Sequence, residues 1–385
     1  MKVPFFDLSA EISNRKAEIL AEISAVIDSG QFVGGPLVEK FEMEFALLNE
    51  SSFCAGVGNG LDAIRLVLEA LEIGPGDEVI VPSFTFYATW LAVMQVGATP
   101  IFADVLEGAA GLNPELIEEA ISLRTSAIIV FHLYGTPSRV SAINRIADKF
   151  SLPVIEACAQ SHCARIEGKK VGTFGLAGAV SFYPTKNLGA IGDAGAASTD
   201  YEQVLHFLKS RRSYGQGNSK YEHIDIGWNS RLDPIQAAVT SFKLRHLAGF
   251  NSRRKDIASS YLEAMGDRSQ KVIGLGQENS VWNHFVIRSD NRESLMHYLA
   301  EQGVGTDIHY PYYNRDSPAL NKYLHISPGQ QLDSPTKGLY VRPGLWRNLQ
   351  TFSKDAVCLV LASEHFDEAD YLHEYSDYLL WAGAN

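Results

Sequence analysis

Residues 181–195 read S-F-Y-P-T-K-N-L-G-A-I-G-D-A-G. The stretch begins as the end of a short apolar strand carrying Ser181 and Tyr183, and continues as a loop with one lysine, Lys186, and three glycines. Glycine adopts backbone conformations that residues with a Cβ avoid, so this loop can close tightly around something small. No acidic residue adjoins Lys186. A lysine held there can lose its proton and attack a carbonyl as a free amine, although a surface lysine in a turn is the plainer alternative.

Outward from this stretch, short apolar runs alternate with helix-like segments between residues 52 and 198. The runs are rich in β-forming residues and apolar throughout, as expected for strands buried on both faces. The helical segments between most of them indicate βαβ crossovers. The pattern predicts an α/β fold with a mostly parallel sheet, whose strands lie near residues 53–57, 78–81, 100–105, 127–131, 153–155 and 179–182.

The flanking sequence is mostly helical in its periodicity. Two helices on either side of a glycine-rich loop at 29–36 precede the sheet, and an amphipathic helix over 232–247 could close the large domain. After residue 251 we expect a helix to about 265, a strand near 284–287, and helices at 293–302 and 367–380. We therefore predict an N-terminal arm and large domain over 1–250 and a small C-terminal α/β domain over 251–385.

Composition limits the classes of function. The chain has 385 residues, is 46% hydrophobic, and carries a formal charge of −12, which argues against nucleic acid or an anionic membrane as partner. No long apolar segment predicts secretion or membrane spanning, and the four cysteines form no CxxC pair, so we expect a cytoplasmic protein with reduced thiols. Cys158, His162 and Cys163 cluster without a further ligand group at suitable spacing, so we expect no metal.

A second glycine-rich loop follows the first predicted strand. Residues 54–65 read C-A-G-V-G-N-G-L-D-A-I-R, so glycines at 56, 58 and 60 lead into a helix. Glycines let the backbone approach an anion, and the helix N-terminus offers free amides and the positive end of its dipole. Alone, this loop is equally well explained as a tight turn.

Taken together, S-F-Y-P-T-K-N-L-G and the N-G-L-D-A of residues 59–63 resemble segments of the DegT/StrS family. Members are aminotransferases that depend on pyridoxal 5′-phosphate (PLP) and act on nucleotide-linked keto-sugars. The resemblance implies that Lys186 holds PLP covalently. It also implies that the cofactor phosphate lies against the residues Gly58, Asn59, Gly60, Leu61 and Ser181.

Residues 82–90, P-S-F-T-F-Y-A-T-W, place several aromatic residues at the start of a helix. Core packing would explain any one of these rings. The resemblance implies instead that Phe86 stacks on the PLP ring. The sequence A-T-W-L-A-V at residues 88–93 most resembles the branch of the family that aminates 3-keto-6-deoxy sugars linked to dTDP.

Residues 153–162, P-V-I-E-A-C-A-Q-S-H, depart from the family at one position. Relatives carry an aspartate at the position of Ala157, where it keeps the PLP pyridine nitrogen protonated; Gln160 and His162 fit. A protonated ring is the stronger electron sink. Neighbours in a strand point to opposite faces, so Glu156 should replace that aspartate only if a β-bulge turns it toward the ring. Three interpretations stay open. The enzyme is a transaminase in which another group contacts the pyridine nitrogen, it is a variant altered at this one position, or it is a family member with changed chemistry.

Two further segments resemble sequence motifs of the family. In G-W-N-S-R-L-D-P-I-Q-A-A, residues 227–238, the resemblance implies that Asn229 reaches the PLP phosphate of a neighbouring subunit, which implies a homodimer with a shared site. An asparagine that caps the following helix is an alternative. In T-D-I-H-Y-P, residues 306–311, His309 and Tyr310 are candidate substrate contacts, together with Tyr183.

These features predict a fold type I PLP enzyme with a mostly parallel seven-stranded sheet and a small C-terminal domain. The resemblance implies amino transfer from L-glutamate to the keto group of a dTDP-linked 3-keto-6-deoxyhexose, with pyridoxamine phosphate (PMP) as the intermediate cofactor form. Lys186 would move the proton between the donor Cα and the cofactor. One alternative is a PLP-dependent sugar dehydratase, in which histidine commonly replaces the lysine. Another is a catalytically impaired cofactor- or sugar-nucleotide-binding homologue, which only Ala157 supports.

Overall fold

A computed structural model describes residues 3–323, except 107, 109, 110, 220, 275, 277, 278 and 312. The last part of the predicted small domain, with the helix predicted at 367–380, lies outside these residues.

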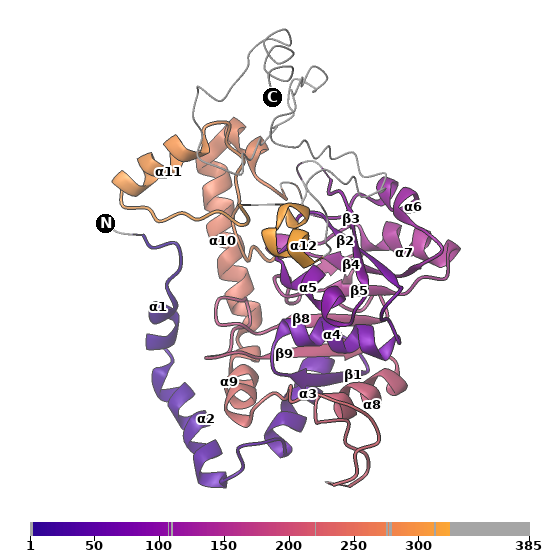
Figure 1. Cartoon of the computed structure of the whole chain (residues 1–385). Helices are drawn as coiled ribbons and strands as arrows, with labels where there is room; N and C mark the ends of the chain where they lie inside the picture. The colour runs from indigo at the N-terminus through magenta and orange to yellow at the C-terminus, as the bar shows by residue number, and fades with distance from the viewer. Residues whose placement is uncertain are drawn as a thin grey trace.

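A seven-stranded sheet forms the centre of the molecule, in the order β1-β9-β8-β5-β4-β2-β3 (Figure 1). Strands β8, β5, β4, β2 and β3 pair in parallel, whereas β9 runs antiparallel to both of its neighbours. The predicted α/β fold with a mostly parallel sheet is confirmed. The strands are β1 (Phe53–Val57), β2 (Glu78–Pro82), β3 (Thr99–Ala103), β4 (Thr125–Phe131), β5 (Val154–Ala157), β8 (Ala177–Ser181) and β9 (Gly195–Thr199), and a separate hairpin joins β6 (Arg165–Ile166) to β7 (Lys169–Lys170).

Strand β9 is missing from the strands predicted above. Its sequence, G-A-A-S-T, consists of small residues and lacks the large β-branched side chains that identify a buried strand. The small residues have a packing reason, because a Cβ added at Gly195 would lie 2.4 Å from the carbonyl carbon of Asn59. The strand is therefore shaped by its contact with the glycine-rich loop.

Helices cover both faces of the sheet, and alternation along each strand decides which face a side chain serves. In β2, Val79 and Val81 join the core beneath α4, α5 and α8, whereas Ile80 joins the core beneath α6 and α7. This two-sided burial explains the unbroken apolar runs. The helices concerned are α4 (Gly60–Ala70), α5 (Ala88–Gln95), α6 (Ile117–Ala120), α7 (Val140–Lys149) and α8 (Glu202–Arg211).

A third cluster packs α3 (Pro36–Asn49) and α9 (Pro234–Leu244) against β1, β8 and β9, with Phe182 in edge contact with two rings of α3. Helix α9 begins where the Asp233 carboxylate accepts the N–H of Gln236 at 3.0 Å. The single helix predicted over 232–247 is in fact two helices, because α9 ends at Leu244 and α10 (Leu247–Met265) follows.

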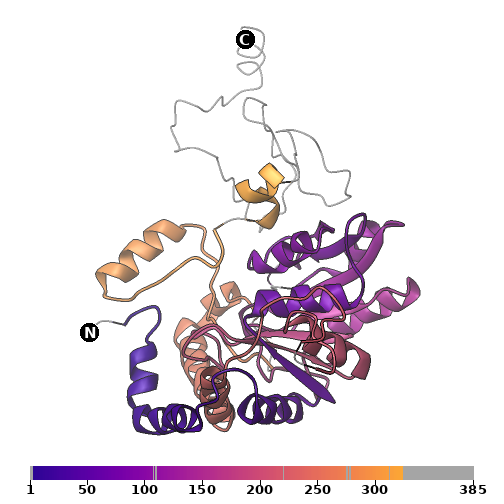
Figure 2. The same cartoon turned by 60° about the horizontal axis from the view of Figure 1, so that its bottom comes forward.

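The N-terminal arm contains α1 (Leu8–Ser13) and α2 (Lys16–Ser29), and α2 packs on α9. Val3 pairs with Val304, so the start of the chain lies beside α11 (Arg292–Glu301), as Figure 2 shows. The predicted strand at 284–287 is only an isolated bridge between Val272 and Ile287, and α12 (Pro318–Tyr323) ends the described chain. Within the described ranges, no helix is long and apolar enough to span a bilayer.

Burial of the sheet-facing helices should dominate stability. Leu66 of α4 is 0% exposed, so Leu66→Ala should lower the free energy of unfolding by about 2–5 kcal/mol. The matched change Leu47→Ala, at a helical position that is 83% exposed, should cost no more than about 0.5 kcal/mol. Urea unfolding followed by circular dichroism measures both, and equal losses would contradict this assignment of the core.

Candidate active site

Lys186 lies in a tight loop at the end of β8. Its backbone N–H donates to the Tyr183 carbonyl at 2.9 Å. A Cβ at Gly189 would lie 2.3 Å from the Pro184 carbonyl oxygen, so only glycine lets the loop close. The Lys186 side chain is half-buried, and this burial lowers its pKa to about 8. Near pH 8, about half of such a lysine is the free amine.

The N-terminus of α4 meets the end of β8. Asn59 caps the helix, since its side-chain oxygen accepts the N–H of Asp62 at 2.8 Å. A Cβ at Gly60 would lie 2.6 Å from the Cβ of Ser181. The Gly58 N–H donates to Ser230 Oγ at 3.2 Å. The two glycine-rich motifs predicted to bind one cofactor are therefore in contact, and Leu61 packs partly buried in the adjoining core.

Gln160 is completely buried and joins three segments. Its side-chain oxygen accepts the Tyr134 N–H at 2.6 Å, and its amide nitrogen donates to the Tyr310 hydroxyl at 3.2 Å. The Tyr134 hydroxyl in turn donates to the His309 carbonyl. Burial raises the pKa of Tyr310 to about 12, so this hydroxyl keeps its proton. The candidates His309 and Tyr310 are thus brought to Gln160.

The aromatic residues of segment 82–90 divide into two groups. Trp90 is buried in the core, whereas Phe86 is 39% exposed, with its ring 5.6 Å from that of Tyr310. Core packing therefore explains Trp90 but not Phe86. Tyr183, the third candidate substrate contact, is exposed at the end of β8 beyond Ser181.

Glu156 points away from this site. Its carboxylate accepts four hydrogen bonds, from His132 Nε2 at 3.0 Å and from the N–H groups of Gly172, Phe174 and Gly175 at 2.6–2.9 Å. Because these contacts occupy the buried carboxylate, it holds the segment around residues 172–175 and is not available to a ring on the other face. The expectation that Glu156 does not replace an aspartate at position 157 agrees with this geometry.

Ala157 ends β5 and is buried in the core that contains Ala179, Leu133 and Tyr134. Position 157 thus offers a methyl group where a carboxylate would be needed to hold a cationic nitrogen.

His132, Glu156 and Cys158 form the cluster with metal-ligand chemistry in the described part of the chain, with ligand atoms within 4.8 Å of one another. Both His132 nitrogens are engaged, one by Glu156 and the other by the Ser138 N–H. The sequence had suggested a different cluster, made of Cys158, His162 and Cys163. It is divided in the structure, because His162 turns to the Lys186 loop and accepts the Leu188 N–H at 3.0 Å.

Asn229 is exposed, and its side-chain oxygen accepts from Arg231 Nε at 3.1 Å. The alternative that Asn229 caps the following helix is wrong, because Asp233 caps α9. Asn229 instead lines a small cavity of about 170 Å³ with Phe32 and Val33 of the early glycine-rich loop.

Several polar residues at the site were not predicted from sequence. Ser230 directly follows Asn229 in a segment that resembles the family, so its position in that segment could have indicated it. Asn251, Asn283 and His284 come from the sequence beyond α9, where no motif marks them. His162 Nε2, Asn283 Oδ1 and His284 Nδ1 are buried without a hydrogen-bond partner, and the charge of Lys186 acts on both imidazoles. Such orphaned atoms are typical of a site that takes a bound group or water.

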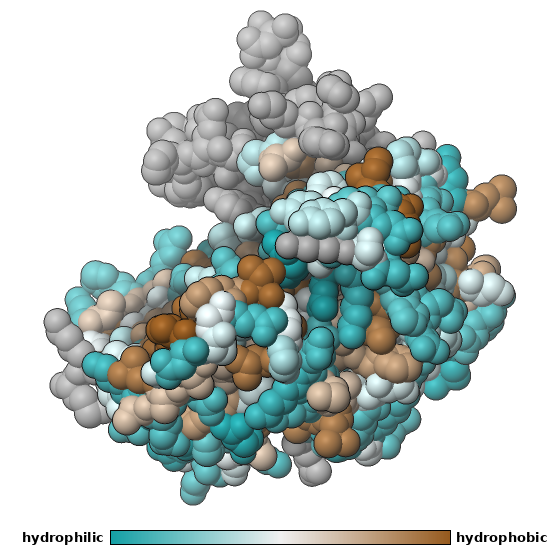
Figure 3. Space-filling view, turned by 90° about the horizontal axis from the view of Figure 1, so that it is seen from below, coloured by the Kyte–Doolittle hydropathy of each residue, from teal (hydrophilic) through white to brown (hydrophobic). Residues whose placement is uncertain are grey.

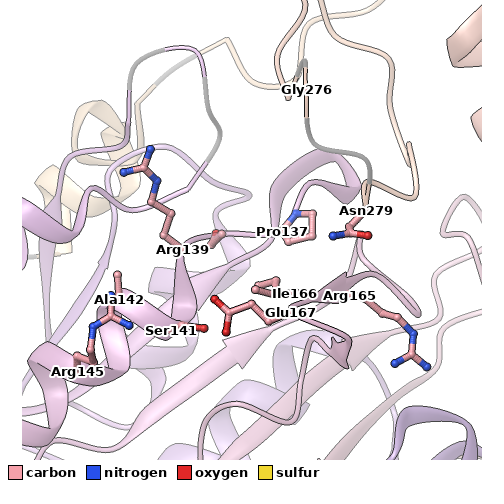
Figure 4. Close-up of a pocket in the computed structure, with 11 residues that line it drawn as sticks. Pro137, Arg139, Ser141, Ala142, Arg145, Arg165, Ile166, Glu167, Gly276 and Asn279 are labelled. Atoms are coloured by element: carbon pink, nitrogen blue, oxygen red, sulfur yellow. The ribbon is translucent and has the colours of Figure 1, made fainter.

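A larger surface hollow of about 660 Å³ shares no lining residue with the site around Lys186. Arg139, Arg145 and Arg165 lie at its wall (Figure 4). The Arg139 and Arg165 side chains point apart there, and Arg165 is already paired with Glu50. The hollow therefore lacks a convergent set of groups.

The lowered pKa of Lys186 can be measured on the protein without cofactor. Because burial disfavours the charged form, the free amine should predominate above about pH 8, and the rate of acetylation of Lys186 by acetic anhydride should rise with a midpoint near that pH. Mass spectrometry of tryptic peptides gives the rate, with the exposed Lys16 as internal reference. A Lys186 midpoint equal to that of Lys16 would contradict the burial described.

Comparison with known proteins agrees with this geometry. Residues 13–331 match the model of the DegT/DnrJ/EryC1/StrS aminotransferase family, and residues 327–382 match a second family model described as WxcM-like, C-terminal. The chain is 40% identical over 343 residues to dTDP-3-amino-3,4,6-trideoxy-alpha-D-glucose transaminase of Streptomyces venezuelae (88% of this chain, 86% of the relative). It is 41% identical over 348 residues to dTDP-3-amino-3,6-dideoxy-alpha-D-galactopyranose transaminase of Aneurinibacillus thermoaerophilus (90% and 96%).

Among solved structures, that of S. venezuelae DesV in complex with a ketimine intermediate superposes with a TM-score of 0.81 at 41% identity, over 87% of this chain and 90% of DesV. The family match spans most of the chain and includes both glycine-rich motifs, Lys186 and the segment that brings Tyr310 to Gln160. This chain belongs to the DegT/DnrJ/EryC1/StrS aminotransferase family.

Proposed function

We propose that the chain is a PLP-dependent aminotransferase that transfers an amino group from L-glutamate to the keto group of a dTDP-linked 3-keto-6-deoxyhexose. The observation that carries the proposal is the half-buried Lys186 in the loop after β8, a strand whose end at Ser181 contacts a glycine-rich helix N-terminus, in a chain of an aminotransferase family. The substrate class comes from the two dTDP-aminosugar transaminases to which the chain is similar.

The residues present fit PLP at its phosphate and carbonyl ends. Gly58 and Gly60 lack the Cβ atoms that would fill the space before α4, and the free amides of the first helical turn suit an anion. The hydroxyls of Ser181 and Ser230 flank the same point. When bound, PLP supplies the carbonyl that an amine can attack and the electron sink that acidifies the donor Cα.

The protein's own contribution is to bind, orient and move protons. Lys186 would hold PLP and, as a free amine, would accept the proton from the donor Cα and donate it again. Phe86 offers an exposed ring face, and the buried Gln160 fixes Tyr310 at the same place. His309, Tyr310 and Tyr183 are the proposed contacts to the sugar.

The ring nitrogen is the part of PLP that the site fits poorly. Ala157 supplies no charge, and Glu156 is held on the other face by four hydrogen bonds. The acid that would favour a protonated pyridine is therefore missing at this point. We propose that the enzyme works with a weaker electron sink than relatives with aspartate at this position.

We also propose a homodimer with a shared site. Support comes from large apolar side chains that stay exposed in the segment before Asn229 and in the loop that it meets, namely Phe32, Val33, Ile224, Ile226 and Trp228. On the face that Figure 3 shows, apolar side chains lie in patches among hydrophilic ones. A second copy of this chain would cover the apolar side chains around Asn229.

A cytoplasmic location and the division at residues 250 and 251 also remain proposals. Cys54, Cys158 and Cys163 are free thiols, which suits a reducing compartment. The proposed domain boundary falls within α10, and the second family match subdivides the proposed small domain at about residue 327.

Turnover tests the proposed activity directly. Incubation with L-glutamate and a dTDP-linked 3-keto-6-deoxyhexose should release 2-oxoglutarate and an amino sugar, detected by mass spectrometry. Lys186→Ala should lower kcat by at least about 10³-fold, since it removes both the covalent anchor and the proton-transfer group. Lys16→Ala, at an exposed lysine, should leave kcat unchanged. Water loss from the sugar without amino transfer would favour the dehydratase instead, and cofactor binding without either reaction would favour the impaired homologue.

Restoring the acid tests the role of position 157. Ala157→Asp should speed the glutamate-dependent bleaching of PLP absorbance from about 420 nm toward about 330 nm, about tenfold for each 1.4 kcal/mol of added transition-state stabilisation. Ala157→Asn, which has the same shape without the charge, should give no such gain. If both variants changed the bleaching rate equally, or if neither changed it, a charge-based role for this position would be contradicted.

A further inference from the structure

Asn187 directly follows Lys186 in the chain, and its side chain is hydrogen-bonded to the side chains of two further asparagines. Asn187 is 4% exposed, and its Oδ1 accepts from Asn283 Nδ2 at 2.7 Å. Its Nδ2 donates both protons, one to Asn251 Oδ1 at 2.7 Å and one to the Val281 carbonyl at 2.9 Å. An amide has two donor protons, so the donor capacity of Asn187 is fully used.

His162 completes this network. Its Nδ1 accepts the Leu188 N–H at 3.0 Å, and its carbonyl accepts from Asn251 Nδ2 at 3.0 Å. Its ring lies 5.7 Å from that of Phe182, with an interplanar angle of 28°. The residues on the C-terminal side of Lys186 are thus held through a backbone N–H and a side chain. We call Asn187, Asn251, Asn283 and His162 the asparagine network.

The network also ties the Lys186 loop to residues 280–284. The Val281 N–H donates to the Gly135 carbonyl at 3.0 Å, and the His284 N–H donates to the Tyr134 carbonyl at 3.2 Å. Gly135 has φ +92°, and a Cβ there would lie 2.7 Å from the Asn283 nitrogen. Since Tyr134 also binds Gln160, a series of hydrogen-bonded segments links Asn187, next to Lys186 in the chain, to Gln160.

Every member of the asparagine network is uncharged. Burial, followed by the charge of Lys186, lowers the pKa of His162 to about 3, so its imidazole stays neutral. Four other titratable or charged groups act on this region. Burial also lowers the pKa values of His284 and His309, and the Arg254 guanidinium lies 3.3 Å from the Asn283 carbonyl oxygen. The fourth is the exposed carboxylate of Asp307, which lies 3.9 Å from His309 Nδ1 and acts on that imidazole. Neither a neutral imidazole nor a cation favours a protonated lysine.

We propose that Asn187, Asn251, Asn283 and His162 are positioning residues for Lys186, and that they fix its loop with neutral groups so that the amine stays free to react. A carboxylate could accept hydrogen bonds in this network, but it could not donate to Asn187 Oδ1 or to the His162 carbonyl as the asparagines do. It would also stabilise the ammonium form of Lys186. The inference rests on the proposed role of Lys186. It adds residues 280–284 to the site, although the sequence beyond α9 carries no motif for them.

The test compares variants of the cofactor-free protein by the acetylation midpoint of Lys186. Asn283→Asp keeps the size of the side chain but places a carboxylate opposite Asn187, so the midpoint should rise by about one pH unit or more. Asn283→Ala removes the hydrogen bond to Asn187, so the midpoint should rise less and kcat should fall about tenfold in the holoenzyme. Should Asn283→Asp fail to fold, Asn251→Asp gives the same test.

The control is Asn144→Ala. Asn144 Nδ2 donates to the Phe174 carbonyl at 2.8 Å, outside the network, so this variant should lower Tm without moving the Lys186 midpoint or kcat. If the Asn283 variants lower Tm in the same way and leave both readouts unchanged, the network is only structural and the proposal is wrong. Shifted midpoints in a protein that aminates no keto-sugar would preserve the positioning role and overturn the proposed function.

Discussion

The close approach of the first turn of α4 to the end of β8 is the constraint on which the site depends. Gly60 and Ser181 are so near that a Cβ at Gly60 would lie 2.6 Å from that of Ser181, and Gly195 is equally tight against Asn59. Parallel strands end at the same edge of a sheet, and this contact brings the lysine loop to a helix N-terminus at that edge. Any side chain at these glycines would separate the two halves of the site.

Much of this arrangement could be predicted from the sequence, and the failures have physical causes. The buried runs from Val79 to Val81 and from Ile128 to Val130 show their strands because burial on both faces demands apolar residues throughout. Strand β9 is built from small residues for close packing, so it gives no such signal. The break between Leu244 and Leu247 was missed because amphipathic periodicity continues across a short turn.

The sequence signals for the candidate site are strongest where special residues and local backbone geometry coincide. The Lys186 loop and the Asn59 cap carry special residues at fixed spacing, so their sequence is informative. Asn251 and Asn283 act through contacts between segments far apart in the chain, and a lone asparagine in a helix or loop carries no record of its partner. Long-range polar contacts of this kind are visible only in three dimensions.

Glu156 and Ala157 are neighbours in β5, but their side chains have different roles. Glu156 is bound by four donors on one face, whereas the methyl of Ala157 is buried in the hydrophobic core on the other. Replacing the first would leave buried N–H groups without an acceptor, but a change at the second breaks no internal hydrogen bond made by its side chain. The hydrogen bonds that hold the sheet are therefore independent of the residue at position 157, so the chemistry offered at that position can differ without altering the fold.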